Sequence, residues 1–251
     1  MNGATLSSAD GATATKPASR AAGKAASFHS RRRTARVTGL WYLALAITGG
    51  TGFLLIRPML YVDGDPAATL ANLVQSPGLA RVGLVLELAL VLTQAIAAVW
   101  FYKLFRSANS TAAWALAAFG MANAVAIMAS AGFLASALTV SSDFGLAPGG
   151  DAAATVQLMY ELSSNSWGVG SLFFGLWLIP MGHIATTSGL MPRWLGRILV
   201  IGGVGYVMST FVKYGFADAP IWLSNALPMP ATVGEFWMIF YLLFKGIHSP
   251  D

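Results

Sequence analysis

Six continuous apolar segments follow one another along the chain after residue 36. Each is long enough, or nearly so, to cross the roughly 30 Å hydrocarbon layer of a membrane as an α-helix rising about 1.5 Å per residue. Strands of a transmembrane barrel would alternate apolar and polar side chains, and these runs rich in Ala, Leu and Gly do not. The pattern predicts spans at residues 37–56, 82–102, 112–140, 167–187, 194–214 and 231–247.

The composition supports a membrane protein. Of the 251 residues, 56% are hydrophobic and 10% are charged, whereas about a quarter of the residues in a soluble domain are charged. We predict an all-α, multi-pass transmembrane bundle of about six spans, which forms one domain over residues 35–251. For residues 152–162, with apolar side chains at mixed helical spacing, two interpretations stay open: a short interfacial helix or an early start of the fourth span.

Residues 1–34 are rich in Ala, Ser, Thr and Gly and predict a disordered basic tail. Twelve of the fifteen Lys and Arg residues lie ahead of the first span or in segments on the same side of the membrane, and five Asp residues lie in the opposite loops. The positive-inside rule therefore predicts that both termini are cytoplasmic and that the chain lies in the cell membrane. We expect the tail to meet anionic lipid rather than nucleic acid.

Two carboxylates fall inside predicted spans, where a charge costs about 2.5–3.5 kcal/mol. Glu87 and Glu235 lie about six and five residues into spans that both run inward from the outer face, so we expect them at similar depth. Three bases border that level, and Gln94 shares the helix face of Glu87. The candidate polar cluster comprises Glu87, Glu235, Arg57, Gln94, Arg81 and Lys213. It is either a solute or proton site or an ion-pair network that sets helix register.

Small residues recur on one face of the fourth predicted span. They are Gly168, Ser171, Gly175 and Gly182. Such faces let helix backbones approach closely, which predicts packing against the glycine-rich fifth span, and a partner protein or a second copy could also use a face of this kind.

The sequence indicates no catalytic residue, metal site or cofactor. The absence of cysteine excludes disulfides, thiolate metal sites and a Cys nucleophile. His183 lies in a span, but no second His or carboxylate stands three or four residues away to complete a metal pair. No P-loop or Ser-His-Asp spacing can be identified.

Three passages resemble the bacterial integral-membrane proteins of domain-of-unknown-function family 4386. They are ARVTGLWY at 35–42, the block from 172 to 206 that contains FFGLWLIPMGH, SGLMPRWLG and GGVGY, and VGEFWMIFYLLFKGI at 233–247. The resemblance implies a six-span bundle and no activity. It identifies Glu235, Lys245, Gly175, Pro192 and Tyr206 as matches to recurring motif positions of that family.

Three functions stay open at this point. The leading hypothesis is a binding or transport-type membrane protein with an outer-leaflet cavity lined by Glu87, Glu235, Arg57 and Gln94. The second is an accessory or structural protein that packs against a partner or itself through small-residue faces. The third is a membrane-embedded enzyme that acts on a lipid-like substrate.

Overall fold

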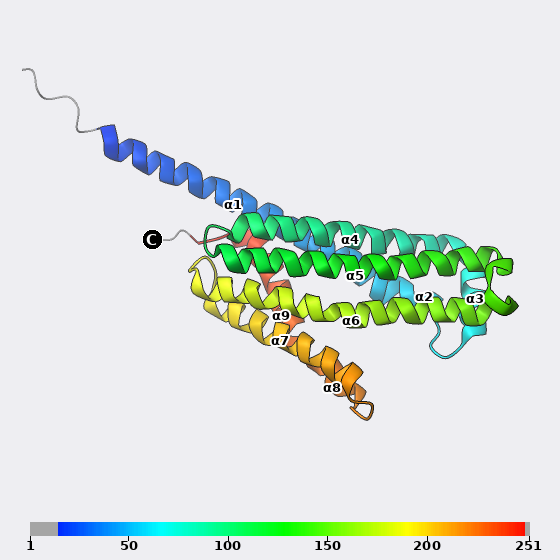
Figure 1. Cartoon of the computed structure of the whole chain (residues 1–251). Coiled ribbons are helices and arrows are strands. Elements are labelled where there is room, and N and C mark those ends of the chain that lie inside the picture. Colours follow the sequence, from blue (N-terminus) through cyan, green and yellow to red (C-terminus); the bar gives the residue numbers. More distant parts are fainter. Residues whose placement is uncertain (1–14, 249–251) are drawn as a thin grey trace, which may run out of the picture.

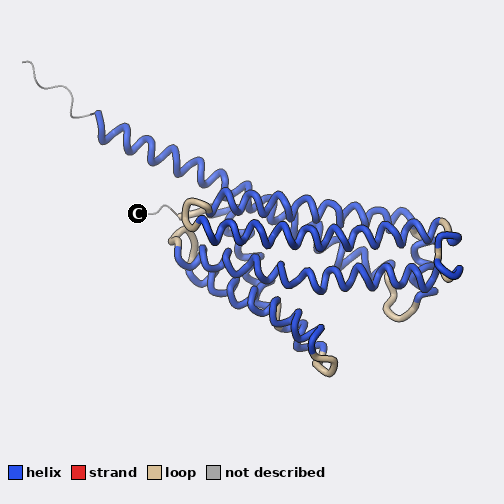
Figure 2. Tube along the Cα trace, viewed as in Figure 1, coloured by secondary structure: helices blue, strands red, loops and turns tan. Residues whose placement is uncertain are grey.

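The computed structural model describes residues 15–248, with side chains described from residue 29 onward, and its ordered elements are helices (Figures 1 and 2). No strand occurs among the described residues. Six helical segments are long and apolar enough to cross a membrane, which confirms the predicted all-α bundle of six spans. These segments are His29–Leu60, Pro77–Phe105, Ser110–Ser142, Ala152–Thr187, Arg193–Gly215 and Ile221–Lys245.

Several of the spans combine more than one helical element. The α-helices are α1 (Thr15–Gly49), α2 (Arg57–Leu60), α3 (Pro66–Gln75), α4 (Pro77–Phe105), α5 (Ser110–Ser142), α6 (Ala152–Thr187), α7 (Arg193–Gly215), α8 (Ile221–Ala226) and α9 (Met229–Phe240). Two π-helical turns, η1 (Gly50–Ile56) and η4 (Tyr241–Lys245), continue α1 and α9. Two 3-10 turns, η2 (Phe144–Leu146) and η3 (Pro148–Gly150), join α5 to α6. The first span thus runs through α1, η1 and α2, and the sixth through α8, α9 and η4.

The first helix begins earlier than the apolar pattern predicted. α1 starts at Thr15, so the predicted boundary between tail and domain at residue 34 lies inside a helix. The physical reason is that the segment ahead of the first span is rich in Ala, Arg and Lys, which are strong helix formers and extend the helix. Residues 1–14 of the expected tail lie outside the described residues.

The fourth span also begins early. α6 runs unbroken from Ala152 to Thr187, so residues 152–162 are the start of this span and not a separate interfacial helix. The carboxylate of Asp151 caps its first turn by accepting a hydrogen bond from the Ala154 amide at 2.9 Å. The side chains of Asp65 and Asn109 cap α3 and α5 in the same way.

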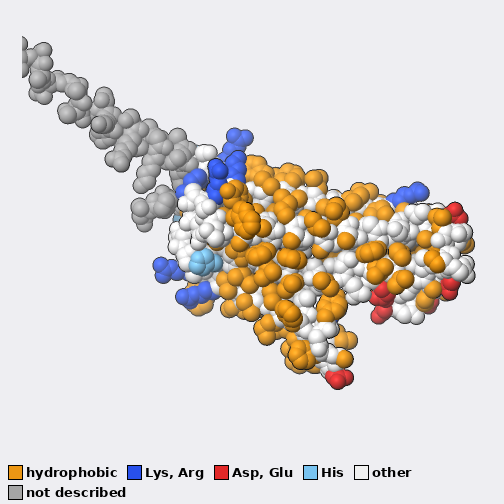
Figure 3. Space-filling model, in the orientation of Figure 1, with side chains coloured by type: hydrophobic (Ala, Val, Ile, Leu, Met, Phe, Trp, Pro, Cys, Tyr) orange, Lys and Arg blue, Asp and Glu red, His pale blue; other side chains and the backbone are white. Residues whose placement is uncertain are grey.

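Charge separates the two ends of the bundle. Figure 3 shows most of the visible Lys and Arg side chains at the end where the N-terminal segment leaves the bundle, Asp and Glu mainly at the far end, and an apolar band between them. We call these the basic end and the acidic end. The band is the surface that the hydrocarbon layer would cover.

Helices α5 and α6 extend past α7–α9 at the acidic end (Figure 1). Their 33 and 36 residues correspond to about 50 and 54 Å, well beyond a hydrocarbon layer of about 30 Å. α7 has 23 residues, and Figure 1 shows that α7–α9 stop short of the end where α3 lies. A separate apolar cluster fills this extension. It comprises Leu60, Leu73, Ala80, Ala137, Val140, Ala147, Ala152, Val156 and Tyr160.

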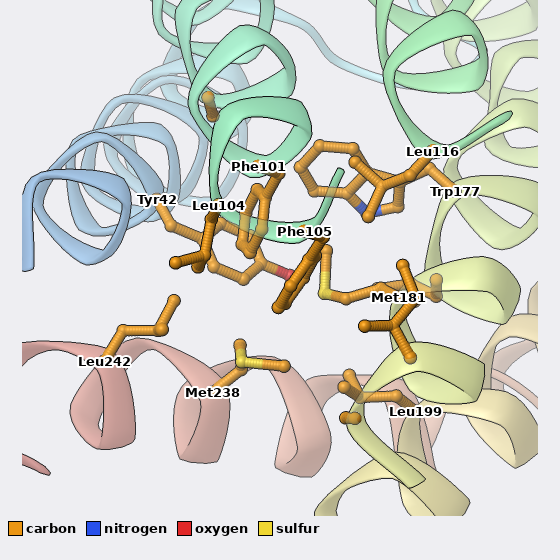
Figure 4. Close-up of a cluster of buried hydrophobic side chains, with 14 of the residues drawn as sticks. Tyr42, Phe101, Leu104, Phe105, Leu116, Trp177, Met181, Leu199, Met238 and Leu242 are labelled. Carbon is orange, nitrogen blue, oxygen red and sulfur yellow. The ribbon is translucent and has the colours of Figure 1, made fainter. Parts of the chain in front are cut away.

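The main core lies toward the basic end, where α1, α4, α6 and α9 meet (Figure 4). Trp177 on α6 is fully buried, with its ring against those of Tyr42 and Phe101. Gly120 makes room for it, since a Cβ on this glycine would lie 2.8 Å from the Trp177 ring. This aromatic group anchors four helices at one point.

The small-residue face of α6 packs against α7 within the chain. A Cβ on Gly175 would lie 2.6 Å from the carbonyl oxygen of Gly203, and Gly182 is equally close to Gly196. Ser171 and Thr210 are hydrogen-bonded across the same pair at 2.7 Å. Both backbones therefore approach closely because neither carries a side chain at the crossing.

Candidate functional site

A cavity of about 490 Å³ lies inside the bundle, with walls from α1, η1, α4, α5, α6, α7 and α9. This volume is within the range of about 300–1,000 Å³ for small-molecule pockets. Most of its lining is apolar or aromatic. The polar side chains on its walls are Tyr42, Gln94, Asn123, Ser164, Ser171, Tyr206, Lys213, Thr232 and Glu235.

Glu235 borders this cavity from α9. The hydroxyl of Tyr42 on α1 donates a hydrogen bond to its Oε1 at 2.5 Å. The Tyr42 ring is fixed edge-on against Phe101 and Trp177, with ring centroids 5.2 and 5.6 Å away. The core packing therefore determines where the donor points, and the donor holds the carboxylate.

Gln94 borders the cavity from α4 and has no partner. Its side chain is fully buried, and neither the amide nitrogen nor the amide oxygen is hydrogen-bonded within the described part of the chain. An unpaired buried amide costs about 1–3 kcal/mol in proteins. The adjacent Thr93 avoids this cost because its hydroxyl bonds back to the Ala89 carbonyl at 2.9 Å. Gln94 is therefore a buried polar side chain on these walls that the described part of the chain leaves unpaired.

A second cavity of about 360 Å³ continues the first toward α8 and the turn between α8 and α9. We call it the polar vestibule, because hydroxyl and amide side chains line much of it. Those not shared with the larger cavity are Ser209, Thr210, Ser224 and Asn225. The residues that border both are Gly168, Ser171, Tyr206, Lys213 and Thr232. A polar path thus leads from the acidic side of α7 to the cavity that holds Glu235.

Arg57 and Glu87 belong to a different polar centre. Arg57 Nη1 donates a hydrogen bond to the Ser163 hydroxyl at 3.0 Å. The hydroxyls of Ser163 and Ser130 are 2.7 Å apart, and Ser130 in turn donates to Glu87. The indole nitrogen of Trp167 donates to Glu87 at 3.1 Å. Two serines therefore relay between the opposite charges, and Trp167 connects this centre to the wall of the larger cavity.

The second guanidinium nitrogen of Arg57 is also bound. Its Nη2 donates to the Tyr160 carbonyl at 3.1 Å and to the Ser164 hydroxyl at 2.8 Å. The guanidinium also lies 5.5–5.9 Å from the ring centroids of Phe53, Tyr61 and Tyr160. Burial raises the pKa of the Tyr61 hydroxyl, so this ring stays neutral beside the cation. Arg57 is thus held in place by hydrogen bonds and aromatic rings of this second centre.

The structure divides the predicted polar cluster between these two places. The predicted residues that border the larger cavity are Gln94, Glu235 and Lys213. Glu87 and Arg57 form the second centre, and Arg81 is exposed and borders neither cavity. Among the small residues of α6, Gly168 and Ser171 border the cavity, while Gly175 and Gly182 face α7.

The expectation that the two carboxylates share one depth is wrong. Glu87 is level with Trp167 on α6, to which it is hydrogen-bonded. Glu235 borders the cavity beside Tyr206, whose ring contacts Phe174 at 5.1 Å, seven residues further along α6. Glu235 is therefore about 10 Å nearer the basic end. The sixth span starts at Ile221 and includes α8. The prediction counted residues from position 231, where the most apolar part begins, and therefore underestimated the depth of Glu235.

Sequence reasoning missed three residues that make these sites. Tyr42 carried no signal, because hydropathy does not tell which residue of the first span faces the sixth. Trp167 contributes to both polar centres, since it donates to Glu87 and borders the larger cavity. Ser163 lay outside the predicted fourth span. The signal that could have identified it is the pair Ser163-Ser164 beside an apolar run.

Comparison with known proteins places the chain in a family. A sequence model described as "Domain of unknown function (DUF4386)" matches residues 37–246. The chain belongs to this family. The resemblance noted in its motifs is thereby confirmed.

One relative of this DUF4386 chain is a protein of Archaeoglobus fulgidus described as "Uncharacterized protein". It is 32% identical over 79 residues, which cover 31% of this chain and 44% of the relative. The match thus spans less than half the length of that curated relative. No solved structure matches the chain.

Three of the five motif positions implied by the DUF4386 resemblance border the larger cavity or support its wall. Glu235 and Tyr206 border the larger cavity. Gly175 makes the close contact between α6 and α7 that supports one of its walls.

Proposed function

We propose that this DUF4386 chain is a binding or transport-type membrane protein that takes a small, membrane-soluble molecule into the larger cavity. The observation that carries the proposal is Gln94, a fully buried amide without a partner on the wall of a cavity of about 490 Å³. An apolar side chain at this position would relieve the desolvation cost, so the amide reflects a requirement other than stability.

The rim of the cavity supports uptake from the bilayer. Leu54 in η1 and Phe236 on α9 border the cavity and are 69% and 49% exposed. Toward the basic end the first and sixth spans close tightly, since a Cβ on Gly39 in α1 would lie 2.8 Å from Leu242 Cβ in η4. The opening between them therefore faces the apolar band. η1 is a π-helical turn, a distortion that is frequent at functional sites.

The alternative of an accessory protein that packs through small residues has less support. The contacts of Gly175 and Gly182 are made by α7 of the same chain, which leaves no separate surface at these two positions for a partner. Binding in the cavity does not need such a surface.

Gln94→Met tests the proposal. We expect this variant to raise the free energy of unfolding of the purified protein by about 1 kcal/mol or more, because a buried unpaired amide is replaced by an apolar side chain of similar length. It should also lose small molecules that co-purify with the wild type. Unfolding would be followed by tryptophan fluorescence in mild detergent, and retained molecules by native mass spectrometry.

Gln157→Met is the matched control. The amide oxygen of Gln157 is also buried without a partner, but this residue lies in the acidic extension and borders neither cavity. The control should keep every co-purified molecule. A Gln94→Met protein that is less stable than the wild type and retains the same molecules would contradict the proposal.

We further propose that the chain lies in the cell membrane with its basic end and both termini in the cytoplasm, next to anionic lipid headgroups. The natural lack of cysteine makes the test direct. A membrane-impermeant thiol reagent applied to intact cells should label Asp218→Cys in the exposed turn before α8. It should label Ser107→Cys, in the exposed turn between α4 and α5, only after permeabilisation. The reverse pattern would invert the topology.

A further inference from the structure

Aromatic rings form a large part of the wall of the cavity that Glu235 borders. They belong to Tyr42, Phe53, Trp167, Phe174, Tyr206 and Phe236, which come from α1, η1, α6, α7 and α9. Aromatic faces attract cations, and the attraction is strongest where water is excluded. Aromatic rings from several helices that share one cavity with a carboxylate are the chemistry by which proteins recognise organic ammonium groups.

The carboxylate itself has no cationic partner. Within the described residues, Tyr42 is the hydrogen-bond donor to Glu235, and no Lys or Arg is near enough to form an ion pair. Arg57 is bound by Ser163, Ser164 and the Tyr160 carbonyl. A lone carboxylate at membrane depth is unfavourable, so it requires a positive charge from outside the chain or a proton.

Lys213 does not meet this requirement. It borders the mouth shared with the polar vestibule, and its Nζ lies 5.3 Å from the ring centroid of Tyr214. A cation at the mouth and a carboxylate deeper in the cavity favour a molecule whose positive charge is buried and whose polar end faces outward. An anionic ligand would have to avoid Glu235 and stay in the vestibule.

Resting on the proposed function, we propose that the larger cavity binds a lipophilic organic cation, an apolar amine or ammonium compound. Its charge pairs with Glu235, its apolar body lies against the aromatic walls, and the unpaired amide of Gln94 provides a hydrogen bond to it. The exposed rim at Leu54 and Phe236 admits such a compound from the bilayer, where lipophilic cations concentrate.

Two probes of nearly the same shape and opposite charge test the proposal: the tetraphenylphosphonium cation and the tetraphenylborate anion. Binding to the full chain in lipid nanodiscs would be measured by thermal stabilisation and by quenching of tryptophan fluorescence. We expect the cation to stabilise the wild type in a concentration-dependent way and the anion not to do so. Equal binding of both probes would show that shape and apolarity alone suffice, and would overturn the inference.

Three variants locate the charge. Glu235→Gln should weaken tetraphenylphosphonium binding at least about tenfold, because the ion pair is lost and the shape is kept. Glu161→Gln, which alters a carboxylate that accepts from Tyr61 and borders neither cavity, should bind as the wild type does. If Glu235→Gln does not fold, Phe236→Leu at the exposed rim should weaken cation binding several-fold. Unchanged binding in both cavity variants would contradict the proposal.

The test separates this inference from the function on which it rests. A wild-type protein that retains a neutral molecule, loses it in Gln94→Met and ignores tetraphenylphosphonium would keep the binding function and reject the cation. A protein that retains nothing and is unaffected by Gln94→Met would reject both.

Discussion

Arg57→Met is expected to destabilise the protein by about 3 kcal/mol, the lower end of the range for breaking a buried charge pair, because Arg57 keeps some exposure. The guanidinium donates hydrogen bonds to the hydroxyls of Ser163 and Ser164 and to the Tyr160 carbonyl. It also balances the charge of Glu87 through the serine relay. Its loss leaves Glu87, which is 9% exposed, without a counter-charge. Unfolding by denaturing detergent, followed by tryptophan fluorescence, measures the effect.

A double-variant cycle identifies the cause of that loss. Arg57→Met combined with Glu87→Leu should recover a large part of the stability, because removing both charges costs less than leaving one of them buried. Arg81→Met, at an exposed base that borders neither cavity, is the control and should change stability by no more than about 0.5 kcal/mol. If the double variant is as unstable as the sum of its parts, the two charges are not coupled and the relay through Ser130 and Ser163 has no energetic role.

Trp177→Ala should destabilise the chain by about 4 kcal/mol, within the range for removing a large aromatic side chain from a core. Its ring contacts those of Tyr42, Phe101 and Phe174, as Figure 4 shows for the first two. In a bilayer the loss comes from missing dispersion contacts rather than from hydration, because lipid is as apolar as the core. The readout is the midpoint of thermal unfolding in mild detergent.

The same variant should disturb the cavity. Trp177 positions the ring of Tyr42, and Tyr42 holds Glu235, so we expect ligand-dependent stabilisation to weaken along with the fold. Trp222→Ala is the matched control, since that indole is 67% exposed and its removal creates no internal void. Equal losses in the two variants would show that Trp177 is no more a core anchor than a surface tryptophan is.

The elements that sequence predicted well are those set by local chemistry. A bilayer forces each apolar stretch to satisfy its own backbone hydrogen bonds, so an apolar run of sufficient length becomes a helix wherever it packs. Glu235 stood out because a carboxylate inside such a run is rare. The start of α6 at Ala152 was one of two interpretations that the sequence left open, because polar residues between 161 and 166 interrupt the apolar pattern inside this helix.

The candidate site was only partly predictable for a different reason. Which side of α1 faces α9 depends on helix rotation, and rotation alone brings Tyr42 to Glu235 and keeps Arg57 away from it. Hydropathy carries no information about rotation in these spans, because residues facing lipid and residues facing other helices are equally apolar. The separation of Glu87 from Glu235 by about 10 Å of depth follows from the same cause together with the unexpected start of the sixth span.

By itself, the sequence determined that six helices cross the membrane, that most of the basic residues collect at one end, that no thiol chemistry is available, and that two carboxylates lie among apolar neighbours. Only the tertiary structure decided that Glu87 is neutralised within a serine relay while Glu235 borders a cavity beside an unpaired amide. The physical reason is that the lipid bilayer forces each apolar segment to form its own backbone hydrogen bonds, which depends on local sequence alone. The rotation and depth of each helix are set by packing between segments that are distant in the chain.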